Sequence, residues 1–85
     1  MKFWKGEKMG ELRLDAKKIG ETICVLRKNK GETVSEAAKA CGVSSQAWSQ
    51  YESGSRIAKD SVKLAIAMHY GGNVGDIFYD QVAHV

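Results

Sequence analysis

The sequence of 85 residues contains no proline and only two cysteines, and its longest nearly apolar run covers just residues 64–68. A transmembrane helix needs about 20 apolar residues, so this run excludes a membrane span. Nine glycines separate helix-forming stretches, which favours a small helical bundle over a turn-rich β-sandwich. The lysines near the N-terminus precede no apolar stretch typical of a secretory signal. We therefore expect a single cytoplasmic domain.

The two cysteines and two histidines form no local pattern for chemistry. Cys24 and Cys41 fall in helix-like segments, so we expect both to be reduced and to pack as small core hydrophobes. A zinc site would require them to converge with His69 and His84, although no Cys-x-x-Cys or His-x-x-x-His pair is present. No nucleophile elbow or phosphate-binding loop occurs either. We expect no metal, no cofactor and no enzymatic activity.

Positive charge is concentrated at one end of the chain. Residues 1–30 hold nine Lys or Arg against four Asp or Glu, while each later third carries a small net negative charge. A positive end suits a polyanion such as DNA, and it equally suits a solvated arm. We therefore divide the chain into a basic and aromatic arm (1–14), a domain (15–79) and a tail (80–85).

Residues typical of helix starts and ends predict two helices in the first half of the domain. Apolar residues recur at helical spacing over about residues 15–29, and Gly31 can end this helix in a left-handed conformation. Thr33 and Glu36 have the spacing of a capping box, in which each side chain satisfies amides at a helix start. A second, short helix is therefore expected to begin there and to end before Gly42.

Three more helices are expected in the second half. Ser44 can cap a helix over about residues 45–53, the apolar periodicity over 60–70 predicts another, and Asn73 can cap a last short one. A short helix, a turn containing glycine and a second helix form the helix-turn-helix arrangement. The predicted fold class is all-α, a compact five-helix bundle with a helix-turn-helix.

The segment KGETVSEAAKACGVS (residues 30–44), with YESG at 51–54, resembles the Cro and phage-repressor type helix-turn-helix family of xenobiotic-response-element-like regulators. That family has the pattern K-G-x-[ST]-x-x-x-[LA]-A-x-x-x-G-[VT]-S, followed by I-x-x-[IYL]-E-x-G. The likeness covers about residues 16–79. It implies a sequence-specific regulator of transcription that binds double-stranded DNA, expected to be a repressor and a homodimer.

The resemblance also assigns residues to DNA contact. The second helix of such a motif enters the major groove, and unpaired glutamine amides on its surface could both donate to and accept from adenine. The alternative is a merely solvated polar face. The matching base-reading positions are Ser45, Gln46, Ser49 and Gln50. The matching phosphate-binding positions are Thr33, Val34, Ser44, Ser55, Arg56 and Lys59.

Two pairs of residues concern the packing of this helix. By resemblance, Arg27 and Glu52 are expected to form a partly buried ion pair, the alternative being two solvated charges. The family commonly has Leu and Ile where this chain has Ala37 and Trp48. We predict that the Trp48 ring fills the space left by Ala37, the alternative being a Trp48 that faces solvent or a partner.

The same fold also serves in antitoxins and other protein-interaction modules, so a toxin or other protein partner stays open as the alternative function. An exposed aromatic patch from Phe3 and Trp4 would favour a protein partner, whereas the polar face of the recognition helix favours DNA. For a homodimer, the expected surface is the last helix with residues 79–85, and the second choice is the arm. Its half-sites would lie about 10 base pairs apart or a multiple of that.

Overall fold

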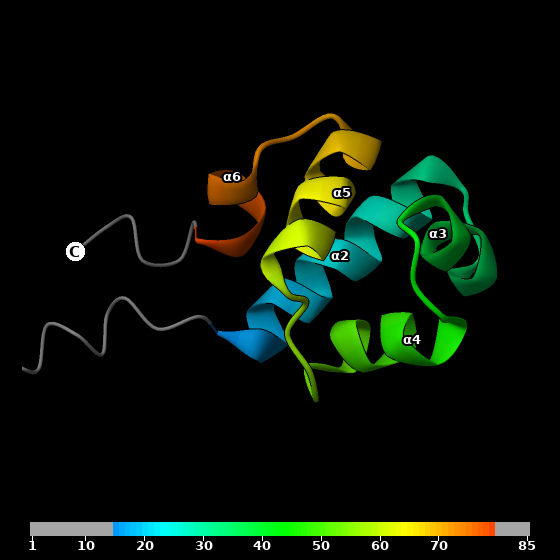
Figure 1. Ribbon diagram of the computed structural model, residues 1–85, viewed down its shortest axis with the longest axis horizontal. Helices are drawn as coiled ribbons and strands as arrows, with labels where there is room; N and C mark the ends of the chain where they lie inside the picture. The colour runs from blue at the N-terminus through cyan, green and yellow to red at the C-terminus, as the bar shows by residue number, and fades with distance from the viewer. Residues whose placement is uncertain (1–14, 80–85) are drawn as a thin grey trace, which may run out of the picture.

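The computed structural model describes residues 15–79, which form helices and no strands (Figure 1). The predicted arm and tail, with Phe3, Trp4 and His84, lie outside this range. The all-α class is confirmed, and the third and fourth helices have the predicted bounds. The helices are α2 (Ala16–Lys30), α3 (Val34–Ala40), α4 (Ser45–Ser53), α5 (Asp60–Tyr70) and α6 (Val74–Phe78).

Side chains cap the starts of α2, α3, α4 and α6, whereas Lys59 at the start of α5 makes no capping hydrogen bond. Thr33 Oγ1 accepts a hydrogen bond from the Glu36 amide at 3.1 Å, and the Glu36 carboxylate accepts one from the Thr33 amide at 2.8 Å. This reciprocal pair satisfies two amides that the first helical turn leaves unpaired. The side chains of Asp15, Ser44 and Asn73 cap α2, α4 and α6 in the same way, each through one amide.

The core takes one large side chain from each of four helices. α2 runs through the middle of the bundle, with α4 on one side of it and α5 on the other in Figure 1. The largest fully buried side chains are Ile23 of α2, Trp48 of α4, Ile66 of α5 and Phe78 of α6. Alanines of α3 pack against this group, so the helix-turn-helix of α3 and α4 rests on a shared core.

α2 and α4 approach each other closely at a glycine. A Cβ atom at Gly20 would lie 2.5 Å from the main-chain oxygens of both Tyr51 and Glu52. Main-chain atoms inside a helix cannot move aside alone, so any larger residue would push α4 away from α2. Gly20 therefore sets the distance at which α4 is held.

The prediction that both cysteines are core hydrophobes is right for one and wrong for the other. Both are free thiols, and Cys41 is buried. Burial raises the pKa of Cys41 to about 11, which keeps this thiol protonated at neutral pH. Cys24 is only half-buried, and its Sγ accepts a hydrogen bond from Nη2 of Arg27 at 3.9 Å.

Within residues 15–79, none of the helices has the length and apolar character that a membrane crossing requires.

Candidate nucleic-acid interface

α4 has one buried face and one exposed face. Ala47, Trp48 and Tyr51 are buried in the core. The predicted base-reading residues lie on the other side, where Ser45, Gln46 and Ser49 are exposed and Gln50 is half-buried. Since residues four apart share a side of a helix, this alternation leaves a continuous polar strip that faces away from the bundle.

Gln46 and Gln50 differ in their surroundings. Gln46 makes no side-chain hydrogen bond within the described part of the chain. Gln50 was expected to be unpaired as well, and that expectation is wrong: its amide oxygen accepts a hydrogen bond from Nη1 of Arg56 at 3.3 Å. The Arg56 guanidinium carbon also lies 5.9 Å from the centroid of the Tyr51 ring. Gln50 and Arg56 therefore form one unit, whereas Gln46 stands alone.

The predicted phosphate-binding residues fall into two groups. Ser44, Arg56 and Lys59 line one open pocket between the turn before α4 and the α4–α5 connection. Ser55 follows α4, where its amide donates to the Gln50 carbonyl at 3.1 Å. Thr33 and Val34 lie at the start of α3 instead. The exposed strip of α4 is thus flanked by polar groups near both of its ends.

No Lys or Arg occurs in α4 itself. Its N-terminal end is nevertheless electrostatically positive, because the first-turn amides of a helix lack intrahelical partners. The Ser44 side chain occupies one of them by accepting from the Ala47 amide at 3.1 Å. The charges of Arg56 and Lys59 lie next to this end in the shared pocket, so the region is suited to an anion such as a backbone phosphate.

The inner face of α4 is tied to α2 by an ion pair. Arg27 Nε donates to Glu52 Oε2 at 2.6 Å, and Arg27 Nη2 donates to Oε1 at 3.2 Å. The Trp48 ring nitrogen also donates to Glu52 Oε2, at 2.6 Å. Only 14% of the Arg27 side chain and 13% of the Glu52 side chain are exposed. The pair is therefore a bidentate, largely desolvated one, unlike the solvated charges of the alternative.

The partners of Glu52 determine its ionisation. Desolvation raises the pKa of this carboxyl, but the hydrogen bonds from Arg27 and Trp48 and the Arg27 charge outweigh it, so the pKa lies below the ordinary 4.5. Glu52 is consequently ionised at neutral pH. The same contact raises the pKa of Arg27.

A second polar cluster was not found by sequence reasoning. The Glu32 carboxylate, in the loop between α2 and α3, contacts His69 Nε2 at 2.5 Å and accepts from the Tyr70 hydroxyl at 2.7 Å. The Tyr70 ring in turn lies 6.5 Å from the Trp48 ring, centroid to centroid. The cluster joins the entry of the helix-turn-helix to the end of α5. No local sequence pattern predicts this cluster, because His69 and Tyr70 lie 37 and 38 positions after Glu32.

Among residues 15–79, no three or more His, Cys, Asp or Glu side chains gather where they could hold a metal ion.

A short helix, a glycine-containing turn and a second helix with an exposed polar strip define the class of Cro/C1-like helix-turn-helix regulators. Residues 18–76 match the family described as helix-turn-helix domain, and the chain belongs to this family of DNA-binding transcriptional regulators. Members with this fold are typically non-enzymatic.

Two solved structures of similar proteins support this assignment. Both are crystal structures of the clp gene regulator ClgR from Corynebacterium glutamicum, each 25% identical in sequence to this chain. One has a TM-score of 0.68 and covers 84% of this chain and 91% of its own. The other has a TM-score of 0.71, with 85% and 76% covered. No curated protein sequence matches the chain.

Proposed function

We propose that this protein is a sequence-specific regulator that places α4 in the major groove of double-stranded DNA. The observation that carries the proposal is the contrast between two faces of α4: Trp48 on one face is fully buried, whereas Gln46 on the other is exposed and makes no side-chain hydrogen bond within residues 15–79. A helix anchored along one side and polar along the other fits the width of the groove and the hydrogen-bonding groups at its floor.

Within this proposal the exposed strip reads bases and its flanks hold phosphates. Gln46 is the principal reader, since its free amide can pair bidentately with adenine. Ser45, Ser49 and Gln50 assist it. Arg56 positions Gln50 as well as neutralising phosphate, so these two roles are coupled in one residue. The remaining backbone contacts come from Thr33, Val34, Ser44, Ser55 and Lys59.

The Arg27–Glu52 pair serves binding indirectly. It fastens the C-terminal half of α4 to α2, close to where Gly20 sets the helix separation. A rigid α4 loses little conformational entropy when it enters the groove, which favours tight and selective binding. In this account Arg27 and Glu52 are positioning residues that touch no DNA.

The protein acts as a homodimer and as a repressor in the cytoplasm, where it meets DNA. One recognition helix contacts only a few base pairs, so two-fold pairing is needed to specify a site of useful length. Occupying the groove at such a site excludes other proteins from it, which accounts for repression.

Selection of bound duplexes from a random pool at about 150 mM salt tests the proposal, because non-specific phosphate binding is weakened there. We expect enrichment of an inverted repeat whose half-sites lie about 10 base pairs apart or a multiple of that. A Ser45→Glu/Gln46→Glu variant is the control: it should fold normally and enrich nothing. Failure of the wild-type protein to enrich any sequence would contradict the proposal and favour an antitoxin or other protein-binding role.

A further inference from the structure

Three large apolar side chains in the described part of the chain are exposed. Val25 and Leu64 are each 55% exposed, and Met68 is 73% exposed. Leu64 and Met68 are four positions apart on α5, so they lie one turn from each other on the same side of that helix. They form the centre of its solvent face, with Ser61 and Ala65 beside them. We call these four residues the α5 outer face.

The middle of α5, residues 64–68, is apolar on both sides. Val62, Ile66 and Ala67 point into the core, and the unbroken apolar run of residues 64–68 continues around to the α5 outer face. A helix that covers a bundle normally carries charged residues on its solvent side, whereas one that is apolar all round is normally buried on both sides. The single lysine of this helix, Lys63, is itself buried. The composition of α5 therefore indicates a partner for its outer face.

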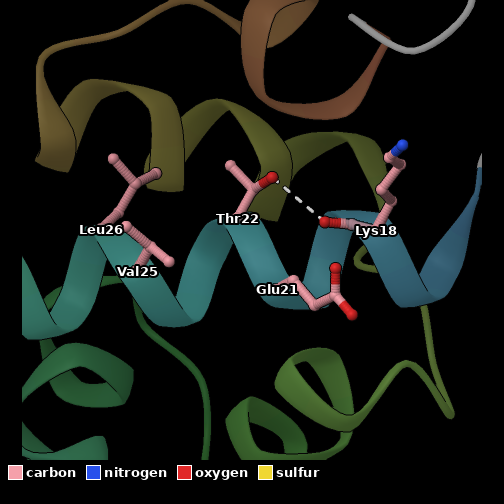
Figure 2. A pocket seen from close by; sticks show the side chains of 5 residues that line it. All are labelled: Lys18, Glu21, Thr22, Val25 and Leu26. Carbon is pink, nitrogen blue, oxygen red and sulfur yellow. Dashed lines mark hydrogen bonds between the residues drawn. The ribbon is translucent and has the colours of Figure 1, made fainter.

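Val25 lies in a different setting. Figure 2 shows Val25 on α2 in a shallow pocket, which is also lined by Lys18, Glu21, Thr22 and Leu26. Thr22 turns its hydroxyl back to the Lys18 carbonyl at 3.1 Å, and charged side chains stand on the same helix face. The only other apolar side chain among these residues, Leu26, is half-buried, and an exposed valine beside charged residues is ordinary surface. Val25 therefore provides a control of matched exposure.

We propose that two copies of this chain pair through the α5 outer face, with their α5 helices antiparallel across a two-fold axis. This inference rests on the proposed function, which requires a two-fold dimer, and it names the surface that forms it. In this arrangement Leu64 of each copy meets Met68 of the other, because a two-fold axis near residue 66 exchanges these positions.

The charges at the two ends of α5 are complementary under this symmetry. Asp60 opens the helix with a side chain that is 99% exposed, although it lies 3.6 Å from Lys63 Nζ. At the other end, Lys30 Nζ donates to the carbonyl of His69 at 3.3 Å, which places an ammonium at the C-terminus of α5. Both ends lie within about 9 Å of residue 66 along the helix. Antiparallel pairing thus brings Asp60 of one copy toward Lys30 of the other, twice per dimer.

The apolar side chains of α6 offer less surface for pairing. Ile77 and Phe78 are buried in the core, so the described part of the last helix presents little apolar surface outward. We therefore place the centre of pairing on the α5 outer face and not on α6; most of the tail that the sequence analysis joined to α6 lies outside the described residues.

Sedimentation velocity on the full chain without DNA tests the proposal. We expect a monomer–dimer equilibrium that Leu64→Glu or Met68→Glu shifts toward monomer by about tenfold or more in Kd. Val25→Glu should leave Kd unchanged. A wild-type protein that stays monomeric at every concentration would overturn the proposal, as would equal effects of Val25→Glu and Leu64→Glu. Unchanged circular dichroism of each variant ensures that folding is not the cause.

Charge-reversal variants test whether the two α5 helices pair antiparallel. Asp60→Lys and Lys30→Glu should each weaken pairing, and the two together should restore it, because the cross-axis pairs are re-formed with opposite sign. Additive weakening in the double variant would overturn the antiparallel arrangement.

Failure of this inference is distinguishable from failure of the proposed function. Leu64→Glu should still bind a DNA fragment that carries a single half-site with wild-type affinity. A chain that pairs through α5 and binds no DNA would contradict only the proposed function. A chain that binds an inverted repeat equally well with or without Leu64→Glu would contradict only the α5 interface.

Discussion

The inner and outer faces of α4 differ in how fully their side chains are partnered. On the inner face, Trp48 is completely buried and Glu52 accepts three hydrogen bonds from two residues. On the outer face, Gln46 is exposed and bonded to nothing in the described chain. The difference shows how one short helix can be rigid and yet leave polar groups free for a ligand. Substitutions on the inner face should therefore change stability, and those on the outer face should change recognition.

Removing the charge of Glu52 should have the largest effect on stability. Glu52→Gln keeps the side-chain shape but leaves Arg27 desolvated without a counter-charge, so the free energy of unfolding should fall by about 3–5 kcal/mol. Thermal and urea unfolding measure this change. Glu21→Gln, on the exposed side of α2, is the matched control and should have almost no effect. An unchanged melting temperature for Glu52→Gln would show that the pair is energetically unimportant.

Trp48→Ile should be the next most damaging change, at about 2–4 kcal/mol, because it leaves a void in the core. Adding Ala37→Leu should recover part of the loss if the Trp48 ring fills the space beside Ala37, both residues being fully buried. Recovery will be incomplete, since Ile cannot donate to Glu52 as the indole does. A double-mutant cycle measures this coupling, and purely additive effects would contradict the packing relation.

Gly20→Ala should destabilise by about 1–3 kcal/mol, because the added methyl group meets main-chain oxygens of α4. Gly72→Ala is the control. There the added Cβ would lie 3.5 Å from the Ile77 side chain, which is an ordinary van der Waals contact. If Gly20→Ala melted at the wild-type temperature, the close approach of α2 and α4 would not constrain the position of α4.

Whether an interaction could be predicted from the sequence depends on how far apart its two residues lie along the chain. The capping box of Thr33 and Glu36 spans three residues, so it was predictable from spacing alone. The Arg27–Glu52 pair spans 25 positions and was expected only because the family resemblance supplied it. The contact between Glu32 and His69 has neither a local pattern nor a family precedent here, and it was missed. The close approach at Gly20 was not predicted either, because the main-chain atoms that it meets belong to residues 51 and 52 of another helix.

On the outer face, Arg56→Ala should leave the free energy of unfolding within about 0.5 kcal/mol of the wild type. Its effect should fall on DNA binding, where loss of one phosphate contact reduces the salt slope of log K by about one per subunit. Titrations over a range of salt concentrations measure this slope. Because Arg56 holds the Gln50 amide, we also expect a small change in base preference. An unchanged salt slope would exclude Arg56 from phosphate contact.

Gln46→Ala gives the most direct test of the division between the two faces of α4, because Gln46 has no partner to lose within residues 15–79. The decisive measurement is the affinity of the wild type and of this variant for a panel of duplexes that differ one base pair at a time from the selected site. We expect the variant to lose about 1–3 kcal/mol of discrimination at one position per half-site, with the other positions and the melting temperature unchanged. Equal weakening on every duplex, or an unchanged preference at every position, would contradict the assignment of α4 as the recognition helix.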